Sequence, residues 1–158
     1  MMHWTVPEMW RRQREEHWRV AVNAQTMMNR SPILSPYYSD LLGLADALVA
    51  EGRYELAVVV AQMACEVVVE QTLTPLLKGK KPPQNFNVHG KGARHVYKRL
   101  THDTIEKQPF WQSYGRHVVR RHDVVHRGGR VGPAEARDST FTARQFVEHV
   151  DQVRRNVR

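Results

Sequence analysis

The sequence contains a single cysteine, Cys65. One thiol cannot form an intramolecular disulfide or supply a cysteine-based zinc ribbon, so the fold must be stabilised by packed apolar side chains. The chain also has no unbroken run of about 18 apolar residues, and no apolar segment follows a basic start at its amino terminus. We therefore expect a soluble, cytoplasmic protein that does not act in a membrane.

Acidic residues are scarce in the second half of this 158-residue chain, whose length suits one domain. Residues 1–76 hold six Lys/Arg against nine Asp/Glu, whereas residues 77–158 hold eighteen against seven. A basic half suits a polyanion, because contacts between phosphates and Lys or Arg release counterions. Solvated helix faces also explain such a charge excess, so charge alone suggests nucleic acid without establishing it.

Helical periodicity covers most of the chain after residue 35. Pro36 favours the first position of a helix over residues 36–51, and Gly52 is expected to end that helix. Residues 53–77 are apolar on nearly all sides, which predicts a long, largely buried central helix. Its narrow polar stripe consists of Glu55, Gln62, Glu66 and Glu70.

Three further helices are predicted after a basic loop at residues 78–92. They cover residues 93–107, residues 110–126 before Gly128 and Gly129, and a final helix opened by a Thr142/Gln145 capping box. The prediction is an all-α antiparallel bundle of four to five helices. Residues 1–35 fit both strand and helix patterns, so we treat them as an N-terminal extension whose structure the sequence leaves open.

The segment RRHDVVHRGG, residues 120–129, contains the arginine–histidine pair Arg121 and His126. Histidine accepts and returns protons near neutral pH, and arginine holds a phosphate through two hydrogen bonds. RNA cleavage needs both roles: His126 would deprotonate a ribose 2′-hydroxyl while Arg121 stabilises the charged transition state. This chemistry requires no metal or other cofactor.

The joint pattern of GRYELA, AQMACEVVVEQTL and RRHDVVHRGG resembles the HEPN family of small all-α proteins over residues 36–157. In that family an R-x4-6-H motif marks metal-independent RNA endonucleases that leave a 2′,3′-cyclic phosphate. The resemblance implies a HEPN-like domain at 36–158, an RNA substrate, and a place in a toxin or defence system. A cognate inhibitor and a nucleotidyltransferase-like protein are further candidate partners.

Several neighbours of the pair have predicted supporting roles. His122 stands where the family often has asparagine, and its ring still offers one hydrogen bond; with Asp123 and Glu66 it is an auxiliary candidate. The candidates for RNA binding are Arg120, Arg127 and Arg130. Arg120, at R-x5-H, remains an alternative to Arg121 as the phosphate-binding arginine.

Helix geometry adds an expectation about assembly. Five residues separate Arg121 and His126 by about 140° around a helix, so one chain does not easily aim both at one phosphate. A homodimer that shares its motif residues removes this difficulty, and the family builds its site in that way.

Two other functions remain open. One is a non-catalytic, HEPN-like module for nucleotide or RNA binding or for dimerisation. The other is a zinc hydrolase on His122 and His126, which resemble the H-E-x-x-H pattern with Asp in place of Glu. Its third ligand would be His117, Glu148 or His149.

Overall fold

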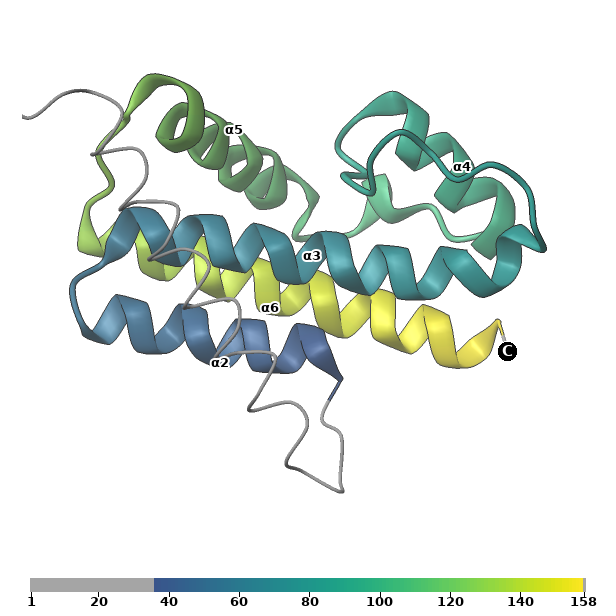
Figure 1. Cartoon of the computed structure of the whole chain (residues 1–158), viewed down its shortest axis with the longest axis horizontal. Coiled ribbons are helices and arrows are strands. Elements are labelled where there is room, and N and C mark those ends of the chain that lie inside the picture. The colour runs from purple at the N-terminus through teal and green to yellow at the C-terminus, as the bar shows by residue number, and fades with distance from the viewer. Residues whose placement is uncertain (1–35, 158) are drawn as a thin grey trace, which may run out of the picture. The chain divides into compact units, whose positions relative to one another are not determined.

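The computed structural model describes residues 36–157, and these form an all-helical bundle (Figure 1). The elements are α2 (Tyr37–Ala50), α3 (Tyr54–Leu77), α4 (Lys91–Thr101), a 3-10 turn η1 (Ile105–Lys107), α5 (Trp111–Arg127) and α6 (Pro133–Asn156). The predicted fold class is confirmed. Our expectations for residues 1–35 fall outside the described part of the chain.

Helix α3 lies in the middle of the bundle, with α2 on one side, α5 and α4 on the other and α6 behind (Figure 1). Small side chains at Ala57, Ala61 and Ala64 are fully buried and allow the neighbouring helices to approach closely. By length and composition α3 meets the test for a membrane span, but 61% of its most apolar stretch is buried. The apolar composition of α3 is therefore accounted for by its place in the core.

The aromatic part of the core lies between α5 and α6. The rings of Tyr114 and Phe146 are stacked with centroids 4.2 Å apart, and Phe110 packs edge-on against Phe146. A buried polar contact joins the opposite side of α6 to α2, where the Tyr38 hydroxyl donates to the Asp151 carboxylate. These contacts hold α6 against both α2 and α5, and so they set the position of α5 in the bundle.

Two predicted boundaries were wrong. The third helix ends at Thr101, because His102 takes a left-handed conformation (φ 60°), and residues 105–107 form a separate 3-10 turn. The last helix starts at Pro133 rather than near Thr142, which is 1% exposed in its interior. Proline favours the first helical position, and the Glu135 carboxylate accepts the Gly132 N–H at 2.9 Å.

Candidate functional site

Helix α5 carries the predicted motif, and its inward face is set by a stripe of residues at helical spacing. Phe110, Tyr114 and His117 are buried, and Arg121 occupies the next position of the same stripe. The helix ends directly after the motif. Gly128 is left-handed (φ 65°), and Gly129 N–H donates to the Asp123 carbonyl at 3.0 Å.

Arg121 and His126 occupy different environments. Arg121 is half-buried, and its Nε is enclosed without a hydrogen-bond partner among residues 36–157. His126 is exposed in the last turn of α5. The structure places both on one helix but does not bring them together at one point, as their angular separation of about 140° requires.

Arg120 is held by α6. Its Nη1 donates to Ser139 Oγ at 2.6 Å and lies 3.4 Å from Asp138 Oδ2, and its Nε lies 3.9 Å from Glu135 Oε1. Only 17% of the Arg120 side chain is exposed. This arginine joins α5 to α6, and its charge is already compensated there.

The remaining motif residues form two i,i+4 pairs. The imidazole rings of His122 and His126 lie with centroids 4.6 Å apart, tilted by 45°. On another face of α5, Arg127 Nη1 contacts Asp123 Oδ1 at 3.1 Å in an exposed ion pair. His122 is therefore the predicted auxiliary residue that the structure places beside His126, whereas Asp123 is paired with Arg127.

Glu66 and Arg130 lie away from the pair. Glu66, on α3, accepts a hydrogen bond from Gln62 Nε2 at 2.9 Å and makes no ion pair with Arg121. The Arg130 side chain is 93% exposed, with Nη1 3.7 Å from the Glu55 carboxylate. The Glu55 carboxylate accepts hydrogen bonds from the backbone N–H of Glu55 itself and from that of Val131, and these hold the pKa of Glu55 below its usual value.

The zinc hypothesis needs a third ligand, and of its two histidine candidates one is bonded to another residue and the other lies in the core. His149 Nε2 lies 2.8 Å from Asp103 Oδ2, and His117 is fully buried. Within residues 36–157 no three His, Cys, Asp or Glu side chains come together in an arrangement suited to a metal ion. His122 and His126 are therefore a pair without a third ligand in the described part of the chain.

His117, which the sequence suggested only as a possible zinc ligand, is a core residue of α5. Its two ring nitrogens are buried without a hydrogen-bond partner among the described residues. Burial, and then the charges of Arg120 and Arg121, lower the pKa of His117 to about 4, so its ring is neutral at pH 7. The spacing from Phe110 and Tyr114 was the available signal that this histidine faces inward.

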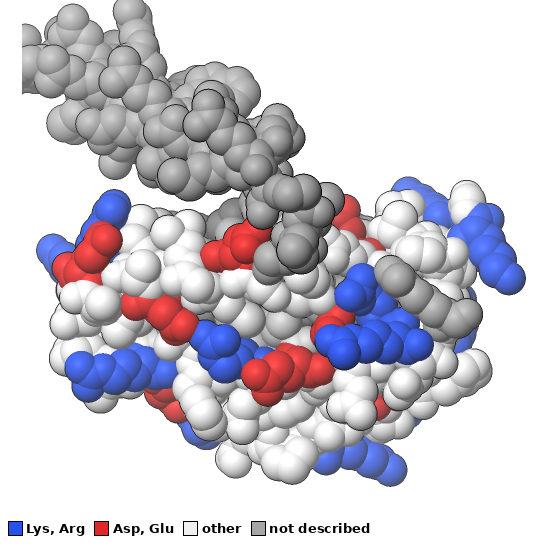
Figure 2. Space-filling view, turned by 90° about the horizontal axis from the view of Figure 1, so that it is seen from below, with Lys and Arg blue, Asp and Glu red and all other residues white. Residues whose placement is uncertain are grey.

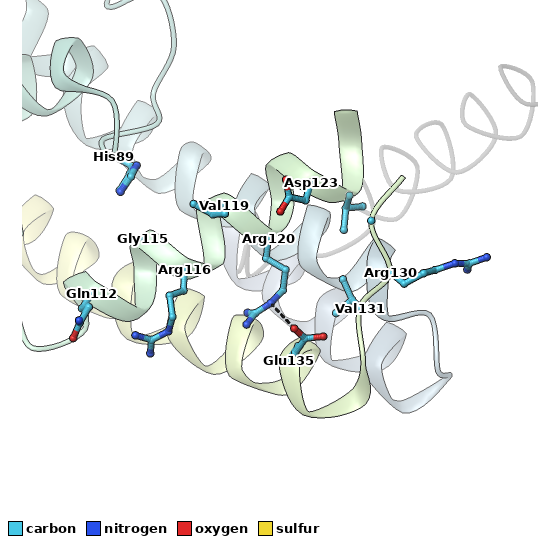
Figure 3. A pocket seen from close by; sticks show the side chains of 12 residues that line it. His89, Gln112, Gly115, Arg116, Val119, Arg120, Asp123, Arg130, Val131 and Glu135 are labelled. Carbon is cyan, nitrogen blue, oxygen red and sulfur yellow. Dashed lines mark ion pairs between the residues drawn. The ribbon is translucent and has the colours of Figure 1, made fainter. Parts of the chain in front are cut away.

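A cleft of about 610 Å³ runs along the solvent face of α5 (Figure 3). Helix α5 contributes Gln112, Arg116, Val119 and Asp123 to it, and Arg130 lies at its other end, beyond the helix. Neither Arg121 nor His126 lines this cleft. The cleft is a second surface feature of α5, separate from the predicted catalytic pair.

The basic residues do not form one continuous patch on the α2 side of the bundle. Figure 2 shows Lys and Arg interspersed with Asp and Glu on this face. One of the acidic partners is Asp46, which forms an ion pair with Arg144. The net charge of the second half of the chain is thus partly balanced at the surface by acidic residues of the first half.

Comparison of the chain with models of known protein families, with curated proteins and with solved structures found no match. The function must therefore be inferred from the side chains and geometry of α5.

Proposed function

We propose that this chain is a metal-independent RNA endonuclease of the HEPN type that acts as a cytoplasmic homodimer in a toxin or defence system. The observation that carries the proposal is the different environment of two adjacent arginines. Arg120 is compensated by Ser139 and the carboxylates of α6. Arg121 forms no ion pair with a carboxylate among residues 36–157, and its Nε has no hydrogen-bond partner there, so its charge is left uncompensated for a phosphate to meet.

The chemistry follows from the exposed position of His126. In its neutral form the imidazole accepts the proton of a ribose 2′-hydroxyl, and the resulting oxygen attacks the adjacent phosphorus. The bond to the 5′-oxygen breaks, and that oxygen takes up a proton from solvent. Arg121 stabilises the negative charge that gathers on the phosphate. The products are a 2′,3′-cyclic phosphate and a 5′-hydroxyl.

The 140° between the two residues supports a site shared by two chains. In a two-fold dimer whose α5 helices run antiparallel, Arg121 of one chain and His126 of the other can face the same phosphate. His122, which contacts His126, then orients the imidazole.

A cleavage assay in EDTA tests the proposal. The wild-type protein should cut a single-stranded RNA, and His126→Ala should not. A single deoxyribose at the cut site should block cleavage there, because it removes the attacking hydroxyl. Activity that EDTA abolishes, together with stoichiometric zinc in the purified protein, would reject this mechanism in favour of the zinc alternative.

The second candidate is a module that binds RNA without cutting it. The separation of Arg121 from His126 within one chain favours this function if the protein stays monomeric. RNA binding without any cleavage, by a protein that light scattering shows to be a monomer, would establish it.

A further inference from the structure

The cleft on α5 carries a positive charge that its own carboxylates do not cancel. Asp123 is paired with Arg127, while Glu135 caps Gly132 and faces Arg120. Figure 3 shows Arg120 turned toward Glu135. The charges of the two carboxylates are therefore committed to other groups, and the free cations of the cleft lie toward its ends.

Two cations of the cleft, Arg116 and Arg130, have no carboxylate partner among the residues that line it. Arg116 is exposed, and its Nη2 donates a hydrogen bond to the neutral hydroxyl of Ser113 at 2.8 Å. Arg130 is 93% exposed, and its 3.7 Å contact with Glu55 is a surface ion pair of the weak kind. Each side chain can turn to an incoming phosphate at little cost.

The floor between the two arginines combines valines with the charged side chains of Arg120, Asp123 and Glu135. Val119 is 57% exposed, and the partly buried Val124 and the buried Val131 line the cleft toward Arg130. At the other end the ring of His89 packs on Trp111 with centroids 5.8 Å apart, which fixes its orientation. The valines and the aromatic ring can contact the sugars and bases of a nucleic acid strand, while the cation at each end can contact its phosphates.

One edge of the cleft is aligned with His126 along α5. Gln112, Val119 and His126 are seven residues apart on α5, so each is rotated by only about 20° from the last and lies about 10.5 Å further along the helix. The first two line the cleft. His126 lies seven residues beyond Val119 on that edge, whereas the cleft itself turns toward Val124 and Arg130.

We propose that the α5 cleft binds the single-stranded RNA that flanks the cleaved phosphate, with Arg116 and Arg130 each contacting a backbone phosphate. The inference rests on the proposed RNA substrate, and it assigns binding to residues outside the catalytic pair. Arg116 becomes a substrate-binding residue, whereas Arg120 is a structural one.

The test measures binding in a protein that does not cut. A fluorescently labelled single-stranded RNA is titrated with the His126→Ala protein, and anisotropy is followed at several salt concentrations. Adding Arg116→Ala and Arg130→Ala should weaken binding at least tenfold. The double change should also make the plot of the logarithm of the binding constant against the logarithm of salt concentration less steep by about 1.4. Each phosphate contact contributes about 0.7 to that slope for a single strand. Circular dichroism checks the fold.

The matched control adds Arg99→Ala and Arg137→Ala, which remove two exposed arginines outside the cleft. It should bind within about twofold of the parent. Equal affinity and equal salt slope for the cleft and control variants would overturn the inference, as would absence of RNA binding by the parent. Cleavage by the wild-type protein is scored separately, so the binding cleft can fail while the endonuclease stands, or the reverse.

Discussion

Arg120 Nη1 lies 2.6 Å from Ser139 Oγ, so the first of the two adjacent arginines of α5 is bonded to α6. Ser139 is fully buried, and the Arg120 side chain is only 17% exposed. A rotation of about 100° along the helix places Arg121 against a different surface, where no carboxylate meets it within the described chain. The contact therefore distinguishes a structural arginine from a candidate phosphate-binding one.

The two arginines should respond differently to lysine. Arg121→Lys keeps the charge but loses the planar pair of donors, so cleavage should fall by about 100-fold or more with an unchanged melting temperature. Arg120→Lys should keep cleavage per folded molecule and lose about 1–2 kcal/mol of unfolding free energy. RNA cleavage and thermal denaturation of both variants check this. Full cleavage by Arg121→Lys beside an inactive, stably folded Arg120→Lys would show that the roles are reversed.

The sequence predicted the first two described helices almost completely, because their ends depend on local chemistry. Pro36 precedes α2, Gly52 (φ 75°) separates it from α3, and the apolar α3 segment is too long for a strand. The start of α6 was missed because Pro133 was assigned to a loop. Glycine followed by proline occurs both in loops and at the first positions of helices, and only the Glu135 contact decides between them here.

The roles of the motif residues were less accessible from the sequence. Consecutive residues point in directions about 100° apart, so the choice between Arg120 and Arg121 depends on what packs against each side. The decisive partners of Arg120, Asp138 and Ser139, lie on another helix, and no local pattern marks them. The burial of His117 could have been predicted from its spacing, but its lack of a hydrogen-bond partner could not.

The buried His117 should make stability depend on pH. Its pKa falls from 6.5 to about 4 on folding, so between these values the unfolded chain binds a proton that the folded chain does not. The contribution of His117 to the free energy of unfolding is fully present above pH 6.5. It decreases by about 3 kcal/mol as the pH falls to 4. Urea unfolding at several pH values measures the effect.

The matched variants for that experiment are His117→Leu and His95→Gln. The first should flatten the dependence of unfolding free energy on pH between 4 and 6.5 by about one proton. The second changes an exposed histidine of α4 and should leave the dependence as it is. An unchanged slope in His117→Leu would mean that another group titrates in this range.

The contact between α2 and α6 should depend on the charge of Asp151. This residue is 6% exposed and accepts hydrogen bonds from Tyr38, Arg154 and Arg155. Asp151→Asn leaves the largely buried Arg154 without its counter-charge, which should cost about 2–4 kcal/mol of unfolding free energy. Arg155→Ala, at a side chain that is 74% exposed, should cost much less, because solvent screens an exposed ion pair. Chemical denaturation of both variants tests the difference, and equal losses would contradict it.

The same carboxylate contributes to acid sensitivity. Burial alone would raise the pKa of Asp151, but the hydrogen bonds from Tyr38, Arg154 and Arg155 outweigh it, and the pKa is lowered. A carboxylate with a lowered folded pKa stabilises the fold above its unfolded value of about 3.8, and this stabilisation is lost as the pH falls further. Asp151→Asn should therefore remove the part of the acid-induced loss that lies below the range of His117.

A shared active site predicts that two inactive variants restore activity when mixed. Arg121→Ala and His126→Ala should each be inactive alone, yet a heterodimer contains one site with an intact Arg121 from one chain and an intact His126 from the other. After denaturation and refolding together in equal amounts, random assortment should return about a quarter of wild-type cleavage. A double variant with both changes, mixed with either single variant, should restore none. If light scattering shows dimers and the mixture still fails to cleave, the two residues do not act across the dimer.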